Sequence, residues 1–205
     1  MRKIITSLAL ILSVYSIQGQ IGYGLTANIE PYQRYNNPED GLAGTSAGNL
    51  FLNFGLGPKI WVGGNNFSIA FEAVANIGLF GLDLNDFKGL GMASFPLMAH
   101  LNFGGTSGLD KEGKFGFTIG GGIQYNKTEL FFQSGGSKEL GVERDLFPTY
   151  IGEVGYGFGM SGFVLNPYIR FGYHPDNSAN SFNLGVRFDF NFRKLKEITD
   201  PASDL

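Results

Sequence analysis

Residues 182–192 read FNLGVRFDFNF, and this stretch decides the fold. Large apolar side chains stand at every second position, and the positions between them hold Asn183, Gly185, Arg187, Asp189 and Asn191. Because successive side chains of a β-strand point to opposite faces, the segment has one apolar face and one small or polar face. The spacing therefore predicts a strand that separates two different environments.

Seven earlier segments repeat this alternation, at residues 21–30, 49–61, 67–79, 93–103, 115–125, 150–160 and 163–173. Their apolar faces carry no charge, whereas the opposite faces carry Glu30, Glu72, His100, Lys114, Glu153, Arg170, Arg187 and Asp189. The sequence offers no helix to cover so much apolar surface, and after residue 20 no apolar run is long enough for a membrane helix. The alternation predicts an all-β fold, an eight-stranded antiparallel up-and-down transmembrane barrel with its apolar face in lipid.

A soluble barrel with an apolar ligand inside is the alternative fold, as in lipocalins. Face sorting alone does not distinguish the two folds, but residue size does. The polar faces hold many glycines, including Gly22, Gly55, Gly120 and Gly155. Small residues suit the concave interior of a narrow barrel and bulky Phe and Leu suit its exterior, which favours the membrane barrel.

The ends of the chain predict export and a short tail. Met1-Arg2-Lys3 is basic, residues 4–14 are apolar, and a small residue, Gly19, precedes Gln20. These features are typical of a cleaved secretory signal, here residues 1–19. We expect the barrel to cover residues 20–192 and a polar periplasmic tail to follow at residues 193–205. Loss of Arg2 and Lys3 with the signal lowers the formal net charge from −3 to −5, which disfavours a nucleic-acid partner.

Connection lengths and aromatic residues predict the orientation. Short turns alternate with longer loops, and bacterial barrels place short turns in the periplasm and long loops outside. Aromatic rings favour both membrane interfaces. We expect a periplasmic girdle of Tyr23, Trp61, Phe67, Phe103, Phe115, Phe158, Phe163 and Phe192, and an outer girdle of Tyr32, Phe80, Tyr125, Tyr150, Tyr173 and Phe182.

In these features the chain resembles the small eight-stranded outer-membrane barrels of the OmpA/OmpX kind. It is especially similar to the β-barrel outer-membrane proteins of the Bacteroidetes group, whose signals often end just before a Gln such as Gln20. Residues 188–192 resemble the C-terminal aromatic signal that the barrel-insertion machinery reads, although such chains often stop at the last aromatic residue. The resemblance implies an integral protein of a Gram-negative outer membrane, with outer-membrane lipid and that machinery as partners.

Residues typical of catalysis are sparse. Cys is absent and the two His are far apart, so no metal-ligand spacing occurs. Residues 157–162 match GxGxxG, but strands flank this string, whereas a dinucleotide fingerprint needs a strand and a helix. His174, Asp176 and Ser178 share the last outer loop but lack the spacing of lipid A deacylases, and Pro175 with Asn177 indicates a turn. We therefore predict no catalytic, cofactor-binding or metal-binding residue and no cofactor.

The charges on the polar faces predict a structural network instead. The interior of an eight-stranded barrel is just wide enough for side chains to fill, and buried charges must be paired. A two-residue hairpin at Ser161-Gly162 sets Glu153 directly opposite Arg170. We expect an interior ion-pair network that plugs the lumen, made of Glu72, Glu153, Arg170, Arg187 and Asp189, with Glu30 and Lys114 as further members.

The sequence supports three functions unequally. A non-enzymatic structural or interaction protein that acts through its extracellular loops is favoured. A porin-like, low-conductance channel is the alternative if the interior glycines leave a water-filled path, and a lipid-modifying enzyme of the envelope is less favoured. The sequence predicts no particular ligand or extracellular partner.

Overall fold

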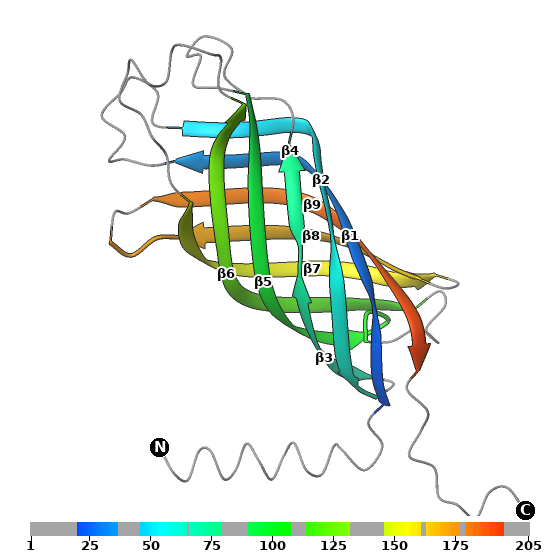
Figure 1. Cartoon of the computed structure of the whole chain (residues 1–205). Coiled ribbons are helices and arrows are strands. Elements are labelled where there is room, and N and C mark those ends of the chain that lie inside the picture. Colours follow the sequence, from blue (N-terminus) through cyan, green and yellow to red (C-terminus); the bar gives the residue numbers. More distant parts are fainter. Residues whose placement is uncertain are drawn as a thin grey trace, which may run out of the picture.

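The chain forms a closed β-barrel in the computed structural model (Figure 1). The structure describes residues 20–36, 46–64, 66–78, 90–107, 114–131, 146–160, 163–176 and 179–194. The predicted signal, the Ser161-Gly162 turn, Phe80, Ser178 and the tail beyond residue 194 lie outside these ranges. Within them, no helix is long and apolar enough to cross a membrane. The strands are β1 (Gln20–Asn36), β2 (Ser46–Gly63), β3 (Phe67–Ala73), β4 (Ala75–Gly78), β5 (Leu90–Gly104), β6 (Phe115–Phe131), β7 (Phe147–Met160), β8 (Phe163–Tyr173) and β9 (Asn180–Lys194).

All pairings are antiparallel, and each crossing pairs with the next one along the chain. β1 pairs with β2 on one edge and with β9 on the other, which closes the sheet. Strands β3 and β4 both lie between β2 and β5, so they make one crossing. The predicted eight-stranded, antiparallel, up-and-down barrel is therefore confirmed.

Two prolines explain the interruption between β3 and β4. The register against β2 is the same on both sides of the break, with Lys59 opposite Glu72 and Leu56 opposite Ala75. Pro96 of β5 therefore lies opposite Val74, and Pro58 of β2 lies opposite the preceding residue, Ala73. The Val74 amide donates to the Pro96 carbonyl at 3.0 Å, but proline has no N–H for a return bond. The crossing is continuous although its ladder is incomplete.

β1 runs further than the alternation predicted, because its pattern changes at Pro31. The pairing with both neighbours shifts between residues 29 and 32, as at a β-bulge. Beyond the bulge Gln33 and Tyr35 point inward and are buried, whereas Arg34 is exposed. An extra residue in the strand therefore ended the visible alternation at Glu30 without ending the strand.

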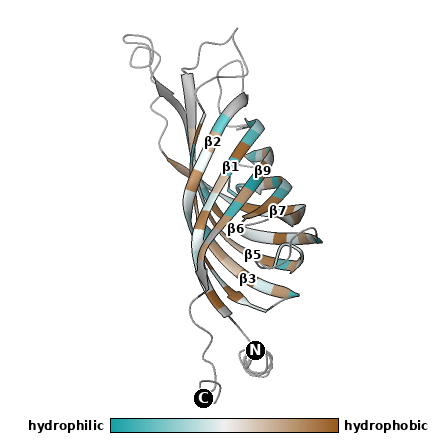
Figure 2. Ribbon diagram, turned by 90° about the vertical axis from the view of Figure 1, so that its right-hand side faces the viewer, coloured by the Kyte–Doolittle hydropathy of each residue, from teal (hydrophilic) through white to brown (hydrophobic). Residues whose placement is uncertain are grey.

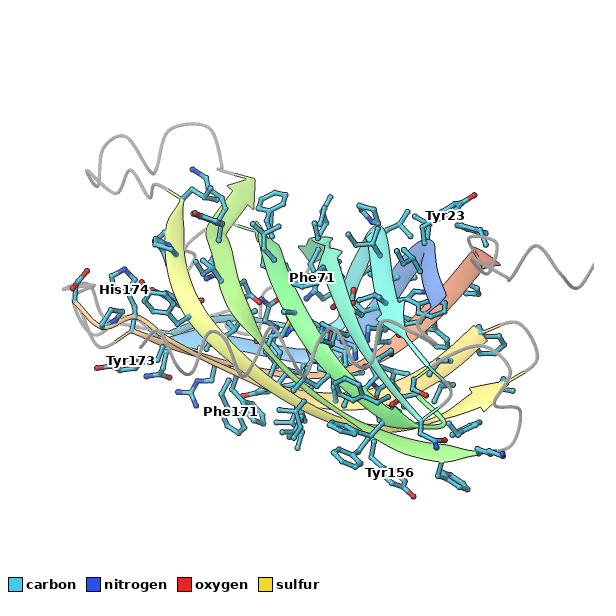
Figure 3. All side chains as sticks on the ribbon, turned by 90° about the horizontal axis from the view of Figure 1, so that it is seen from below. Tyr23, Phe71, Tyr156, Phe171, Tyr173 and His174 are labelled. Atoms are coloured by element: carbon cyan, nitrogen blue, oxygen red, sulfur yellow. The ribbon has the colours of Figure 1, made fainter. Side chains whose placement is uncertain are left out.

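The two faces of the wall differ in chemistry as the alternation predicted. Apolar positions point outward and are exposed, and Figure 2 shows hydrophobic residues alternating with polar ones along the strands. The outward side chains Tyr23, Phe71, Tyr156, Phe171 and Tyr173 project away from the barrel in Figure 3. The buried side chains are mostly polar or charged, so the interior of the barrel is a polar core.

The expected position of Trp61 is wrong. Trp61 is only 6% exposed and shares the inner face of β2 with Lys59, whereas Ile60 and Val62 point outward. Strict alternation from Phe54 onward already places residue 61 inside, and the preference of aromatic rings for interfaces was given too much weight. Within the described residues, the other predicted girdle residues are half-buried or exposed on the outer face.

Candidate functional site

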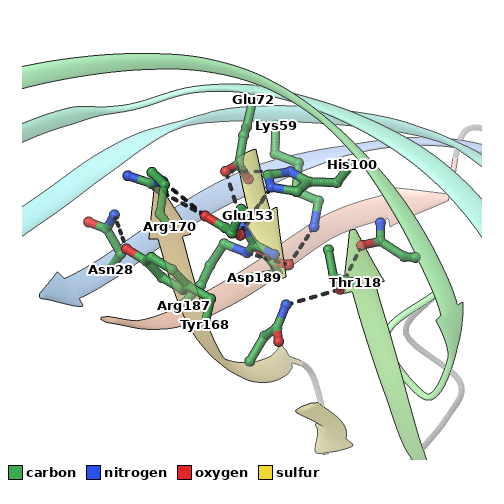
Figure 4. A network of polar contacts seen from close by, with 12 residues as sticks. Asn28, Lys59, Glu72, His100, Thr118, Glu153, Tyr168, Arg170, Arg187 and Asp189 are labelled. Carbon is green, nitrogen blue, oxygen red and sulfur yellow. Dashed lines mark hydrogen bonds and ion pairs between the residues drawn. The ribbon is translucent and has the colours of Figure 1, made fainter. Parts of the chain in front are cut away.

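The centre of the lumen holds an ion pair between two neighbouring strands. Glu153 of β7 lies directly opposite Arg170 of β8, in the predicted register. The Arg170 guanidinium donates to Glu153 Oε2 from Nε at 3.0 Å and from Nη2 at 2.8 Å. Both residues are almost fully buried. This charge-assisted pair lies at the core of the network drawn in Figure 4.

A second arginine joins the same carboxylate from β9. Arg187 Nη1 donates to Glu153 Oε1 at 2.6 Å and to Glu72 Oε1 at 3.3 Å. Its Nε lies 3.7 Å from Asp189 Oδ2. Glu153 therefore links two guanidiniums, and the structure brings all five predicted network residues together.

The lysine of the network is Lys59 and not Lys114. Lys59 Nζ donates to Asp189 Oδ2 at 2.5 Å, and both side chains are buried. Lys114 is exposed and precedes the first residue of β6, so the strand alternation does not apply to it. Lys59 lies within the predicted segment 49–61, on the same face as Asn53 and Gly55, so a signal for it was present in the sequence.

Glu30 has four hydrogen-bond donors around its carboxylate. Its Oε1 accepts from Tyr168 at 2.6 Å and Arg170 at 2.9 Å, and its Oε2 accepts from Asn53 and Asn183, both at 2.7 Å. The sequence predicted Glu30 and Arg170 as members of the network but not the Asn and Tyr partners, because these carry no charge that pairs them. The four bonds compensate the cost of burying this carboxylate.

The rings of Tyr168 and His100 complete the network. The Tyr168 ring lies 4.8 Å from the Arg170 guanidinium carbon and 5.7 Å from that of Arg187, within the range of cation–π contacts. His100 Nε2 lies 3.1 Å from Glu153 Oε1 and 3.1 Å from Arg187 Nη1. Both rings tie β5 and β8 to the charged centre.

Glycines on the inner face make room for these large side chains. A Cβ at Gly120 would collide with the His100 ring, and a Cβ at Gly185 would collide with the Tyr168 ring. His100 and Tyr168 are thus each accommodated by a glycine on the adjacent strand.

Aromatic residues lie across both ends of the lumen. At the end where β1 finishes, the rings of Tyr35 and Phe147 are 4.4 Å apart and pack on fully buried Ala179. At the other end Trp61 lies over Gly22, and the turn after β5 folds inward so that Thr106 and Ser107 are buried. The Thr106 hydroxyl lies 3.0 Å from each of the carbonyl oxygens of Phe103 and Phe117 and can donate to either. Packed side chains therefore lie above, within and below the network.

The sequence motifs considered above can be placed on the described residues. No group of three or more His, Cys, Asp or Glu among them could hold a metal ion. His174 Nδ1 accepts a hydrogen bond from the Asp176 backbone amide at 3.3 Å, which is a turn contact. The GxGxxG string begins in β7 and β8 starts at Phe163, so strands flank it as expected.

Comparison with known proteins gives structural likenesses only. No family model matches the sequence, and no curated protein matches it significantly. Neisserial surface protein A is 10% identical over 83% of this chain and 97% of its own, with a TM-score of 0.47. Ail, the attachment invasion locus protein of Yersinia pestis, is 11% identical over 85% of this chain and 99% of its own, with a TM-score of 0.45. At this identity and these scores, the likenesses add nothing to the fold that strand pairing establishes.

Proposed function

We propose that this chain is an integral outer-membrane protein with a closed lumen, without enzymatic activity, that acts through the loops at its outer end. One observation carries the proposal: the wall is apolar and exposed outside, while each buried charged side chain that the structure describes has a partner of opposite charge inside. A soluble barrel for an apolar ligand needs the reverse arrangement.

The outer face supports a lipid environment. Leu56, Phe115 and Phe171 are 58%, 63% and 57% exposed, and they are only examples from a surface that surrounds the barrel. Soluble monomers rarely expose apolar patches of more than a few hundred Å². Lipid covers such a surface without cost, and strands closed into a barrel leave no unpaired edge in it.

The interior supports a plug in preference to a channel. Glu153 bonds to both Arg170 and Arg187, Arg187 also bonds to Glu72 of β3, and aromatic side chains pack at both ends. An ion that crosses this space must break charge-assisted bonds between fully buried groups. This arrangement disfavours the low-conductance channel.

The orientation and the remaining partners are part of the proposal. The connections between β2 and β3 and between β7 and β8 are short, which favours a periplasmic position for them and for the start of β1 and the end of β9. The loops opposite would then be extracellular and available to a partner. We also infer that strand β9, which carries Phe188, Phe190 and Phe192 near its end, is presented to the barrel-insertion machinery of a Bacteroidetes-type Gram-negative envelope.

Cell fractionation and electrical recording test the proposal together. We expect the full chain in the outer-membrane fraction, with heat-modifiable migration in detergent, and no discrete conductance steps from purified protein in planar bilayers. Recovery in the soluble periplasmic fraction contradicts the membrane assignment. Reproducible conductance steps identify a channel, and lipid A that changes in mass with the gene identifies an enzyme.

A further inference from the structure

A small pocket lies at the end of the lumen where β1 begins and β9 ends, beside the Lys59–Asp189 ion pair. It measures about 210 Å³ including the part open to solvent, with room inside for one water-sized species. The described residues that line it are Lys59, Trp61, Ser68, Asn102, Thr106, Ser107 and Val164. The pocket lies next to the network but none of the contacts in the network's centre uses it.

Trp61 contributes a buried donor without a partner. The indole Nε1 is inaccessible to solvent and has no hydrogen-bond partner among the described residues. An indole nitrogen can only donate, and a buried donor left without an acceptor is costly. The pocket that Trp61 lines therefore favours a species that accepts a hydrogen bond.

Two further side chains offer donors at the same place. An ammonium has three N–H groups, and the contact of Lys59 with Asp189 uses one of them. Ser68 Oγ accepts from the Asn102 amide at 3.3 Å, which leaves the hydroxyl hydrogen of Ser68 as a donor. Lys59 and Ser68 are both about nine-tenths buried or more.

Several polar groups around the pocket already have partners. Asn102 Oδ1 accepts from Thr118 at 3.0 Å, and the Thr106 hydroxyl lies 3.0 Å from each of two backbone carbonyls. Elsewhere in the lumen the unpartnered atoms are mostly acceptors, such as the Oδ1 atoms of Asn28 and Asn76. The unpartnered indole N–H of Trp61 is thus unusual among the described residues of the lumen, because it is a donor.

We propose that this pocket binds one small monovalent anion, of halide size, between Lys59, Trp61 and Ser68. An anion only accepts hydrogen bonds, which is what these three donors offer, and its bonds are charge-assisted. Asp189 does not repel the anion strongly, because Lys59 and Arg187 both lie against that carboxylate.

The chain carries its own probe for this site, since Trp61 is its one tryptophan. Bromide, a heavy-atom quencher, is titrated against purified barrel in detergent, with sodium gluconate keeping the ionic strength constant. We expect quenching that saturates and that chloride or formate reverses by competition. Crystals grown in bromide should show one anomalous difference peak between the three donors.

Two serines provide a matched pair of variants. Ser68→Ala removes a donor from the pocket and should weaken bromide binding about tenfold or more, because bonds to charged groups are among the stronger ones. Ser94→Ala removes a buried serine outside the pocket, which accepts from Asn76 at 3.1 Å, and should leave binding unchanged. The double variant Lys59→Met with Asp189→Asn removes both charges and should abolish saturation without stranding a carboxylate.

The outcomes distinguish bromide bound in the pocket from bromide that quenches Trp61 without binding there. Saturable quenching that Ser68→Ala weakens and Ser94→Ala does not supports the proposal, whichever small anion competes best. Quenching that rises linearly with bromide, or that is equal in all folded variants, overturns it. Both results are independent of whether the barrel lies in a membrane.

Discussion

The outer face and the inner face of this wall obey opposite rules, although they alternate residue by residue along the same strands. Outside, side chains such as Val154 and Ile169 lie opposite each other and share no specific partner. Inside, the neighbouring pair Glu153 and Arg170 belongs to a network in which each group fixes the next. The outer face needs only apolar character, whereas the inner face needs particular residues at particular places. On the outer face, a substitution should therefore be tolerated if the new side chain is apolar. On the inner face, only the particular residue should be tolerated.

The strongest test of this difference is to break the centre of the network. Glu153→Gln leaves the Arg170 and Arg187 guanidiniums without their shared carboxylate, at a cost of about 3–5 kcal/mol for a buried pair. Unfolding by urea in lipid vesicles measures the loss. Arg170→Met should cost a similar amount alone, and the double variant should cost much less than the two losses added together.

Additive losses in that cycle would show that the two residues do not act as a pair in the folded barrel. The control is Lys114→Met, which removes an exposed charge outside the network. It should change the unfolding free energy by less than about 0.5 kcal/mol. The comparison then separates the loss of a buried pair from a mere change in net charge.

A charge on the outer face should also destabilise the barrel, because it would lie in lipid. The loss should depend on the depth of the charge in the membrane. Val154→Arg places a cation in the middle of the apolar wall and should cost about 2–4 kcal/mol in lipid. Tyr173 is the last residue of β8 and lies near the proposed outer interface. Tyr173→Arg should therefore lower the unfolding free energy by only about 0–1 kcal/mol. Urea unfolding in vesicles gives both values. Equal losses at the two depths would argue against a membrane around this wall.

Three consecutive glycines on β6 allow the same change, Gly to Ala, to be tested on both faces of the wall. Gly120→Ala meets the His100 ring, and Gly122→Ala meets the backbone of β5, so each should cost about 1–3 kcal/mol through overpacking. Gly121 points outward, and its nearest neighbour would lie 3.5 Å from an added Cβ. Gly121→Ala should be neutral or stabilise by up to about 1 kcal/mol. Similar losses at all three positions would mean that strand flexibility, and not lumen packing, selects glycine here.

The difference between the outer face and the inner face also explains how much could be predicted from the sequence. Alternation fixes which face each residue takes, so the strands and the residues around Glu153 could be located without coordinates. The opposition of Glu153 and Arg170 followed from a tight hairpin between adjacent strands, where register depends on a few residues. The pattern failed where it changes locally, at the Pro31 bulge and just before Phe115.

Contacts across the lumen could not be predicted in the same way. Tyr168 bonds to Glu30 over a separation of 138 residues, and Lys59 bonds to Asp189 over 130 residues. Such contacts depend on the tilt and closure of the whole barrel. Neutral donors such as Asn53 and Asn183 add a second difficulty, because nothing in their chemistry identifies one partner in advance.

The smallest expected effect asks whether the outer face contains any specific contacts. The rings of Phe103 and Phe117 lie opposite each other on β5 and β6, stacked with centroids 4.4 Å apart and an interplanar angle of 13°. Such a pair contributes about 0.5–1.5 kcal/mol beyond the area it buries. Phe103→Leu, Phe117→Leu and the double variant form a cycle whose coupling energy should fall in that range in lipid vesicles. Phe117→Leu combined with Phe71→Leu, two residues on strands that do not pair, should give additive losses. A coupling near zero for the stacked pair would mean that acyl chains replace the lost ring contact, and that identity on this face matters even less than proposed.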